Sequence, residues 1–129
     1  MAQAEAVIGE ANYAVTIHSG SHALTSDEPL GVGGKDAGPT PSDLLAAALA
    51  ACTVITLRMY AERKGWPLPS AGASVRYSKR QDQQPLMERT LRLPSGLTEE
   101  QRQRCREIAE RTPVTLALKS GVEIRTELA

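Results

Sequence analysis

The sequence predicts a single α+β domain spanning residues 1–129, organised around one long helix. Residues 39–65 form an apolar segment with a helix-starting signal at one end and a helix-stopping signal at the other. Short segments of alternating apolar and polar residues lie on both sides of it, and a second helical pattern follows near the end. We therefore expect antiparallel strands around a long central helix, with a shorter helix beside them.

A hairpin is predicted ahead of the long helix. Tyr13, Val15 and Ile17 alternate with polar or small residues, and residues 22–25 return after a Ser-Gly-Ser turn. Residues 27–39 are rich in glycine and proline, but the glycine spacing fits no phosphate-binding motif. We interpret this stretch as a connecting loop.

The long helix has clear signals at both ends. Thr40 can cap its start with Pro41 at the first helical position, and Asp43 stands where a short capping box needs it. Gly65 stops the helix after a basic last turn. The helix would be about 35 Å long.

The middle of this helix, residues 44–57, carries almost no polar side chains. A helix that is apolar nearly all round must be buried on most faces. One sheet and one short helix are too few to cover it, so we expect a homodimer with the long helices packed together. The apolar run of 14 residues is shorter than the ~20 that span a bilayer, so no membrane insertion is expected.

The second half alternates between strands and helices. Residues 73–77 and 88–93 alternate as two strands, and residues 122–128 alternate as a closing strand. Residues 98–111 form an amphipathic helix that opens on a capping box. Residues 114–118 add a short turn after it.

Composition narrows the function. Fifteen basic and fifteen acidic residues cancel, which argues against nucleic-acid binding. The start of the chain lacks the pattern of a signal peptide, so the cytoplasm is the expected location. No cofactor motif is found, and His18 and His22, which flank a hairpin turn, lack the third ligand of a metal site.

Two cysteines are the candidate reactive groups. Cys52 lies in the middle of the apolar helix, with no cation within one turn, and it is too far from the helix start for the dipole to activate it. A cysteine in such a setting is commonly structural. Cys105 falls on the apolar stripe of the second helix, with Ile108 and Ala109.

The stretch GGKDAGPTPSDLLAAALAACTVITLRMYAERKG resembles the OsmC/Ohr family of osmotically inducible and organic hydroperoxide resistance proteins. The segment LTEEQRQRCREIAERTPVTLAL, near the end of the chain, extends the resemblance. It implies an intertwined α+β homodimer with two sites at the subunit interface. In this family a peroxidatic cysteine on the central helix attacks a hydroperoxide, and a second cysteine resolves the sulfenic acid. By the motif, Cys52 matches the peroxidatic position.

The chain departs from this family pattern at the resolving cysteine, which stands immediately before the proline of a CPV motif. Here that position is Thr112. Cys105 lies seven residues earlier, about 10 Å along a helix. Disulfide geometry needs Cα atoms within about 7 Å, so we expect no Cys52–Cys105 bridge.

The family's assisting residues are also changed. The family uses an arginine from the N-terminal region and a glutamate just after the helix proline, whereas here no arginine precedes Arg58 and Ser42 follows the proline. Lys35, from the family-like loop, is the cation we select, and Asp43 is the carboxylate. Asp43 lies nine residues before Cys52, about 13 Å away along the helix, so it would serve the other chain's site across a dimer.

The resemblance implies a thiol-dependent organic hydroperoxide reductase in oxidative stress defence, with weak or one-cysteine activity. Its catalytic set would be Cys52, Asp43 and Lys35, and its partners a hydroperoxide, a thiol reductant and a second copy of the chain. No cofactor is expected. Two alternatives stay open: a catalytically degenerate dimer that binds a small apolar ligand, and a redox sensor based on Cys52.

Overall fold

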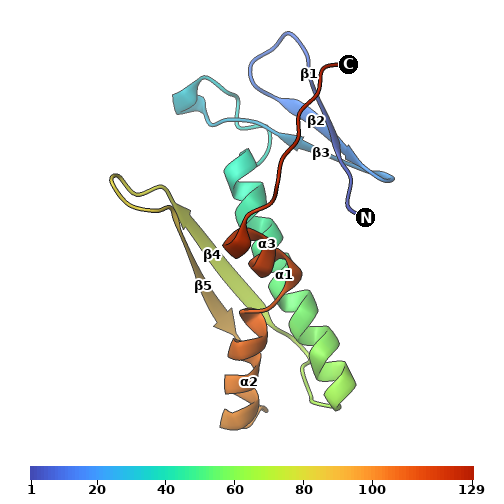
Figure 1. Cartoon of the computed structure of the whole chain (residues 1–129), viewed down its shortest axis with the longest axis vertical. Helices are drawn as coiled ribbons and strands as arrows, with labels where there is room; N and C mark the ends of the chain where they lie inside the picture. Colours follow the sequence, from blue (N-terminus) through green and yellow to red (C-terminus); the bar gives the residue numbers. More distant parts are fainter. The chain divides into compact units, whose positions relative to one another are not determined.

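The computed structural model describes all residues from Met1 to Ala129. The chain divides into two compact units, residues 1–45 and residues 46–129. Helix α1 (Pro41–Lys64) begins in the first unit and runs on through the second. The elements are antiparallel sheets, one long helix and two shorter helices, which confirms the α+β class (Figure 1).

The first unit holds a three-stranded antiparallel sheet in the order β1-β2-β3. Strands β2 (Val15–Ser19) and β3 (His22–Ser26) form the predicted hairpin, which turns at Gly20 with φ of 60°. Strand β1 (Glu5–Ile8), which the alternation pattern did not reveal, pairs with β2. A short 3-10 helix, η1 (Leu30–Val32), follows in the glycine-rich loop.

Asp27 organises that loop. Its side chain is buried and accepts four backbone N–H bonds, from Tyr13 (3.3 Å), Glu28 (2.7 Å), Lys35 (3.1 Å) and Ala37 (3.1 Å). The Ala37 bond, followed by those from the other amides, holds the pKa of the Asp27 carboxyl below its usual range, against the opposing effect of burial. The loop is thus folded around one carboxylate.

Gly34 lets the loop close over that carboxylate. A Cβ at this position would lie 2.0 Å from the Glu28 carbonyl oxygen and 2.8 Å from Asp27 Oδ1. Both distances are far below van der Waals contact, so only glycine allows the approach. The loop is therefore more constrained than a plain connection.

The second unit combines most of α1 with a hairpin and two helices. Strands β4 (Gly72–Ser78) and β5 (Leu86–Arg92) pair antiparallel, as predicted. Helix α2 (Glu99–Ala109) opens with the predicted capping box at Thr98. The segment after it, α3 (Pro113–Ser120), is a helix of eight residues rather than a short turn.

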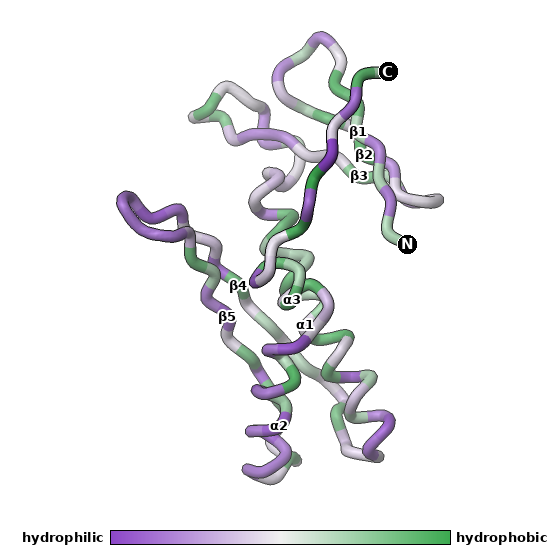
Figure 2. The backbone as a smooth tube through the Cα atoms, viewed as in Figure 1, coloured by the Kyte–Doolittle hydropathy of each residue, from purple (hydrophilic) through white to green (hydrophobic).

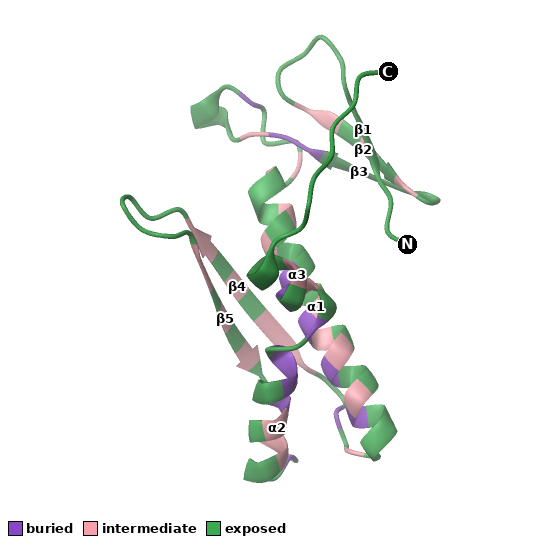
Figure 3. Cartoon of the chain, viewed as in Figure 1, coloured by how far each residue is buried: buried purple, intermediate pink, exposed green.

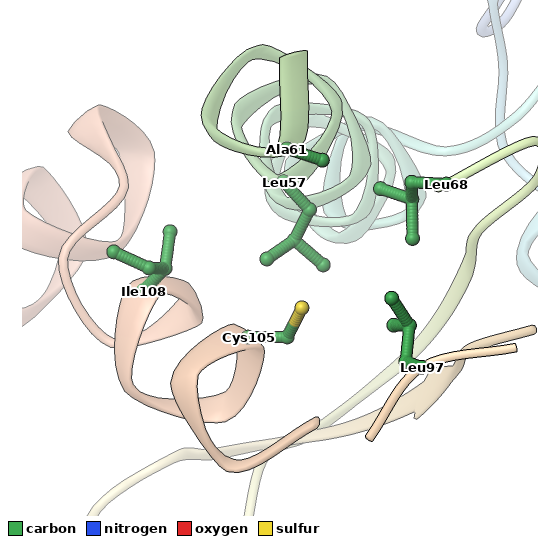
Figure 4. Packing of buried hydrophobic residues seen from close by; sticks show 6 residues of the cluster. All are labelled: Leu57, Ala61, Leu68, Leu97, Cys105 and Ile108. Carbon is green, nitrogen blue, oxygen red and sulfur yellow. The ribbon is translucent and has the colours of Figure 1, made fainter. Parts of the chain in front are cut away.

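The core of the second unit lies between α1 and α2. Figure 2 shows apolar residues along the middle of α1, and Figure 4 shows the buried side chains pointing toward one another. They come from α1, from the connection after it, from the loop before α2 and from α2 itself: Leu57, Ala61, Leu68, Leu97, Cys105 and Ile108. Full burial of one such leucine contributes about 1.5–3 kcal/mol.

One sequence expectation differs from the structure. The segment 122–128 forms no strand, and its apolar residues are exposed (Figure 3). Its alternation is typical of a strand, but a strand forms only where an edge is available to pair with it. Within the chain α1 buries only Leu49, Thr53, Leu57 and Ala61, which agrees with the expectation that one sheet and one short helix are too few to cover it.

Candidate functional site

Cys52 lies in the middle of α1 as a free, half-buried thiol. Its Sγ is 4.0 Å from the hydroxyl of Thr56, one helical turn further on. The neighbouring residue on one side, Ala51, is exposed, and Thr53 on the other side is fully buried. The thiol therefore stands at the edge of the buried face of α1 and is partly exposed to solvent.

Cys105 has the opposite surroundings. It is free, 2% exposed and enclosed by the apolar core (Figure 4). Burial raises the pKa of the Cys105 thiol, and the Arg102 charge offsets this only in part. A buried thiol with a raised pKa is a poor nucleophile at neutral pH. Cys105 is therefore a core residue, as its helical position predicted.

Thr112 caps helix α3. Its hydroxyl accepts the N–H of Thr115 at 3.2 Å, and the two threonine hydroxyls are 2.7 Å apart. Thr112 is fully buried, and Pro113 follows at the first helical position. A threonine cap with proline after it is a favourable helix start. The Thr112 side chain thus stabilises the start of α3.

Arg89, on β5, joins the elements of the second unit. Its Nη1 donates to the hydroxyls of Thr53 on α1 (3.0 Å) and Thr115 on α3 (2.9 Å). Its Nη2 donates to Glu110 at the end of α2 (2.8 Å). The Arg89 side chain is only 11% exposed, so this is a largely buried cation with partners on α1, on α3 and at the C-cap of α2.

Glu110 is the carboxylate of this cluster. Its second oxygen accepts from Lys119 Nζ at 2.6 Å. The pKa of the Glu110 carboxyl is lowered mainly by the Lys119 bond, with a further contribution from the charge of Arg89. Because Glu110 is largely exposed, we attach no large stabilisation to this pair.

Sequence reasoning did not select Arg89, although a signal was present. Along β5, Arg89 falls in the same alternating phase as Met87 and Leu91, which are part-buried, while Glu88 and Thr90 are exposed. A charged residue on the inward phase of a strand needs a buried partner. That anomaly would have marked Arg89, but its partners are distant in sequence.

The other two selected residues belong to the first unit. Asp43 takes part in the predicted helix cap: its Oδ2 accepts the N–H of Thr40 at 3.0 Å, and its own N–H donates to the Thr40 hydroxyl. Lys35 is exposed, and its ammonium group forms no ion pair. Both side chains are therefore exposed to solvent.

The two histidines do not form a pair. In the β2–β3 register His18 lies opposite Ala23, and Ser19 lies opposite His22. Opposite residues share a face and successive residues alternate, so His18 and His22 project from opposite faces of the sheet. No group of three or more potential metal-ligating side chains is present.

Several hollows lie along α1 in the second unit. One of about 820 Å³ is walled by Tyr60, Trp66 and residues of α2, and Arg104 Nε donates to the Tyr60 hydroxyl there at 2.9 Å. This bond is the main cause of the lowered pKa of Tyr60. Another, of about 400 Å³, is lined mostly by α1 residues between Val54 and Glu62. Cys52 lines neither of these two hollows.

Comparison with solved structures places the fold. The chain superimposes on an osmotic stress induced and detoxification response protein from Psychrobacter arcticus 273-4 with a TM-score of 0.78 and 17% identity, over 91% of this chain and 88% of that one. An OsmC-like protein from Mycoplasma pneumoniae gives 0.73 and 19%, over 92% and 87%. The organic hydroperoxide resistance protein OhrB of Bacillus subtilis gives 0.64 and 25%, over 100% and 98%.

Sequence comparison identifies the family. No curated protein sequence matches the chain. A family model described as OsmC-like protein matches residues 33–127, which takes in the end of the constrained loop from Gly33 on, the whole of α1 with Cys52, and α3 with its threonine cap. The chain belongs to the OsmC-like protein family.

Proposed function

We propose that this protein is a thiol-dependent hydroperoxide reductase that works with one cysteine, Cys52. The observation that carries the proposal is the contrast between its two thiols: Cys52 is half-buried on the central helix, and Cys105 is enclosed in the core. Membership of the OsmC-like family supports it. Hydroperoxide resistance proteins are among the similar solved structures, which also favours this chemistry.

The reaction needs three steps. The Cys52 thiolate attacks the outer oxygen of a hydroperoxide, the O–O bond breaks, and the leaving alkoxide takes a proton to give an alcohol and a sulfenic acid. An external thiol then attacks the sulfenic sulfur, which forms a mixed disulfide and water. A second external thiol releases the reduced enzyme and an external disulfide. Because Thr112 stands at the α3 cap, we assign resolution to external thiols.

Lys35 and Asp43 are proposed as the assisting groups. A thiolate in apolar surroundings needs a nearby cation, and Lys35 is an exposed cation without an ion-pair partner. Asp43 would orient that cation or the substrate from a neighbouring copy. A lysine lacks the two-pronged geometry of an arginine, which is why we expect weak activity.

We propose a homodimer as the active form, in the cytoplasm. Its basis is the exposed apolar surface of α1, on which Ile55 and Met59 are 53% and 59% exposed, together with the exposed apolar residues of the segment 122–128. Packing against a second copy would remove both surfaces from water.

The test is consumption of cumene hydroperoxide with dithiothreitol as reductant. We compare the wild type with Cys52→Ser and with Cys105→Ala, which avoids a hydroxyl in the apolar core. Loss of activity in Cys52→Ser alone supports the one-cysteine cycle. Equal loss in both variants would indicate a two-cysteine cycle, and an inactive wild type would contradict the proposed function.

A further inference from the structure

We propose that Arg89 is a positioning residue for Cys52: through Thr53, it fixes the turn of α1 that carries the thiol against the start of α3. This inference rests on the proposed function, since it concerns the reactivity of the same thiol. It follows from the hydrogen bonds that Arg89 donates in the second unit, and it assigns a role to a largely buried cation that the proposed reaction does not use.

The direction of each bond can be worked out. The Thr53 hydroxyl donates to the carbonyl of Leu49 at 2.7 Å, so only its lone pairs remain to receive Arg89. The Thr115 hydroxyl donates to the carbonyl of Ala109 at 3.0 Å, so it also meets Arg89 as an acceptor. Each contact thus joins a donor with an acceptor, and the hydroxyl protons of Thr53 and Thr115 can be placed in only one way.

The same accounting extends to the α3 cap. Because the Thr115 proton is committed to Ala109, the hydroxyl of Thr112 must donate to Thr115 across their 2.7 Å contact. Arg89 is therefore linked on one side to α1 at Thr53 and on the other to the first turn of α3. These hydroxyls belong to side chains that are 0–5% exposed.

Burial makes the arrangement rigid. A charge removed from water is costly unless it is paired, and an arginine cannot avoid that cost by losing a proton. The guanidinium plane fixes the angle between the two bonds from Nη1 and the bond from Nη2 to Glu110. Rotation or sliding of α1 at Thr53 would break at least one of them.

Cys52 is covalently joined to Thr53, so whatever fixes the Thr53 turn also fixes the thiol. Attack on a peroxide oxygen requires the sulfur to lie in line with the O–O bond, and a 1 Å misplacement can cost about 100-fold in rate. We expect loss of the Thr53–Arg89 bond to lower the rate of Cys52 oxidation about tenfold or more, with little change in KM.

The two Thr53 variants separate the effect of the hydroxyl from the effect of side-chain shape. Thr53→Val keeps the branched side chain but removes the hydroxyl, and Thr53→Ser keeps the hydroxyl. Arg89→Met removes the cation. Arg92→Met serves as the control on the same strand, because Arg92 is exposed and donates to Ser74 at 2.6 Å, outside the cluster. All are made with Cys105→Ala, so that Cys52 is the single thiol.

Two rates are measured on natively folded protein: loss of free thiol with cumene hydroperoxide, and alkylation of Cys52 by iodoacetamide. We expect slower reaction in Thr53→Val and Arg89→Met, and wild-type rates in Thr53→Ser and Arg92→Met. Wild-type rates in Thr53→Val would overturn the inference. So would a rate in Thr53→Ser as slow as that in Thr53→Val. Alkylation keeps the test valid if the hydroperoxide is not a substrate, so failure of the proposed function is distinguishable.

Discussion

Cys52 and Cys105 carry the same side chain, and their surroundings give them different chemistry. Cys52 lies at the edge of the buried face of α1 with a threonine hydroxyl 4.0 Å away, while Cys105 is 2% exposed among aliphatic side chains. Desolvation disfavours a thiolate and blocks access of reagents. The sequence therefore offers two candidates for the reactive thiol, and the difference in their burial favours Cys52.

Replacement of Cys105 by alanine should leave peroxide reduction intact. The change removes one buried sulfur from the cluster that also holds Leu57 and Ile108, so we expect a loss of about 1 kcal/mol in the free energy of unfolding. Urea unfolding measures that loss, and the cumene hydroperoxide assay measures activity. A wild-type stability would show that Cys105 is not packed as described.

Asp27 makes the first unit sensitive to acid. Its pKa is lowered in the folded state, mainly by the Ala37 amide bond, so the stability it contributes is present above its ordinary pKa of about 4 and is lost as the pH falls through the folded value. We expect amide protons of Lys35 and Ala37 to exchange faster as the pH drops from 5 toward 2, after correction for intrinsic exchange rates.

Asp27→Asn is the matched variant for that prediction. The amide keeps the shape but carries one carbonyl oxygen and no charge, so it cannot accept all four N–H bonds. The loop should be less protected at pH 7, and the acid dependence should largely disappear. Equal acid dependence in Asp27→Asn and wild type would assign the effect to other carboxylates.

Local signals explain why the helices could be predicted. The capping boxes at Thr40 and Thr98 both form, and Gly65, with φ of 71°, follows the last residue of α1. These bonds join residues three apart, so the sequence contains both partners. The two hairpins were also predicted, since alternation and turn residues are local features.

What depends on distant partners could not be predicted in the same way. The segment 122–128 alternates like a strand, but alternation does not supply a pairing edge. Arg89 finds Thr53 and Thr115 at sequence separations of 36 and 26 residues, which no periodicity encodes. The catalytic roles of all three selected site residues, Cys52, Lys35 and Asp43, stay predictions.

The start of α3 is the element in which a second cysteine could be restored. Thr112→Cys would recreate the family's resolving position and would cost about 1 kcal/mol for the lost cap. We expect oxidised Thr112→Cys to form a disulfide with Cys52, detected by mass spectrometry after digestion, and to need less external thiol. Ser120→Cys, exposed at the other end of α3, is the control. If oxidised Thr112→Cys formed no disulfide with Cys52, position 112 would not be the resolving position for this thiol.

At the scale of the whole molecule, α1 has more apolar surface than the chain covers. By length and composition it could cross a membrane, with a mean hydropathy of 1.8 over a window that is 22% buried. Yet it packs against α2 through Leu57 and Ala61, which is how the core helix of a folded unit behaves. We infer that a second copy, rather than lipid, covers the rest.

A charge on that uncovered face tests this inference. Ile55 is 53% exposed, so Ile55→Asp should fold as a single chain but place an unpaired carboxylate in the dimer interface. Such a charge costs several kcal/mol when buried, which weakens association by at least about 100-fold. Gln103→Asp, exposed on α2, is the control. In sedimentation equilibrium we expect dimers of wild type and Gln103→Asp and monomers of Ile55→Asp. A wild type that stays monomeric at micromolar concentration, or an Ile55→Asp variant that dimerises equally well, would place the interface elsewhere.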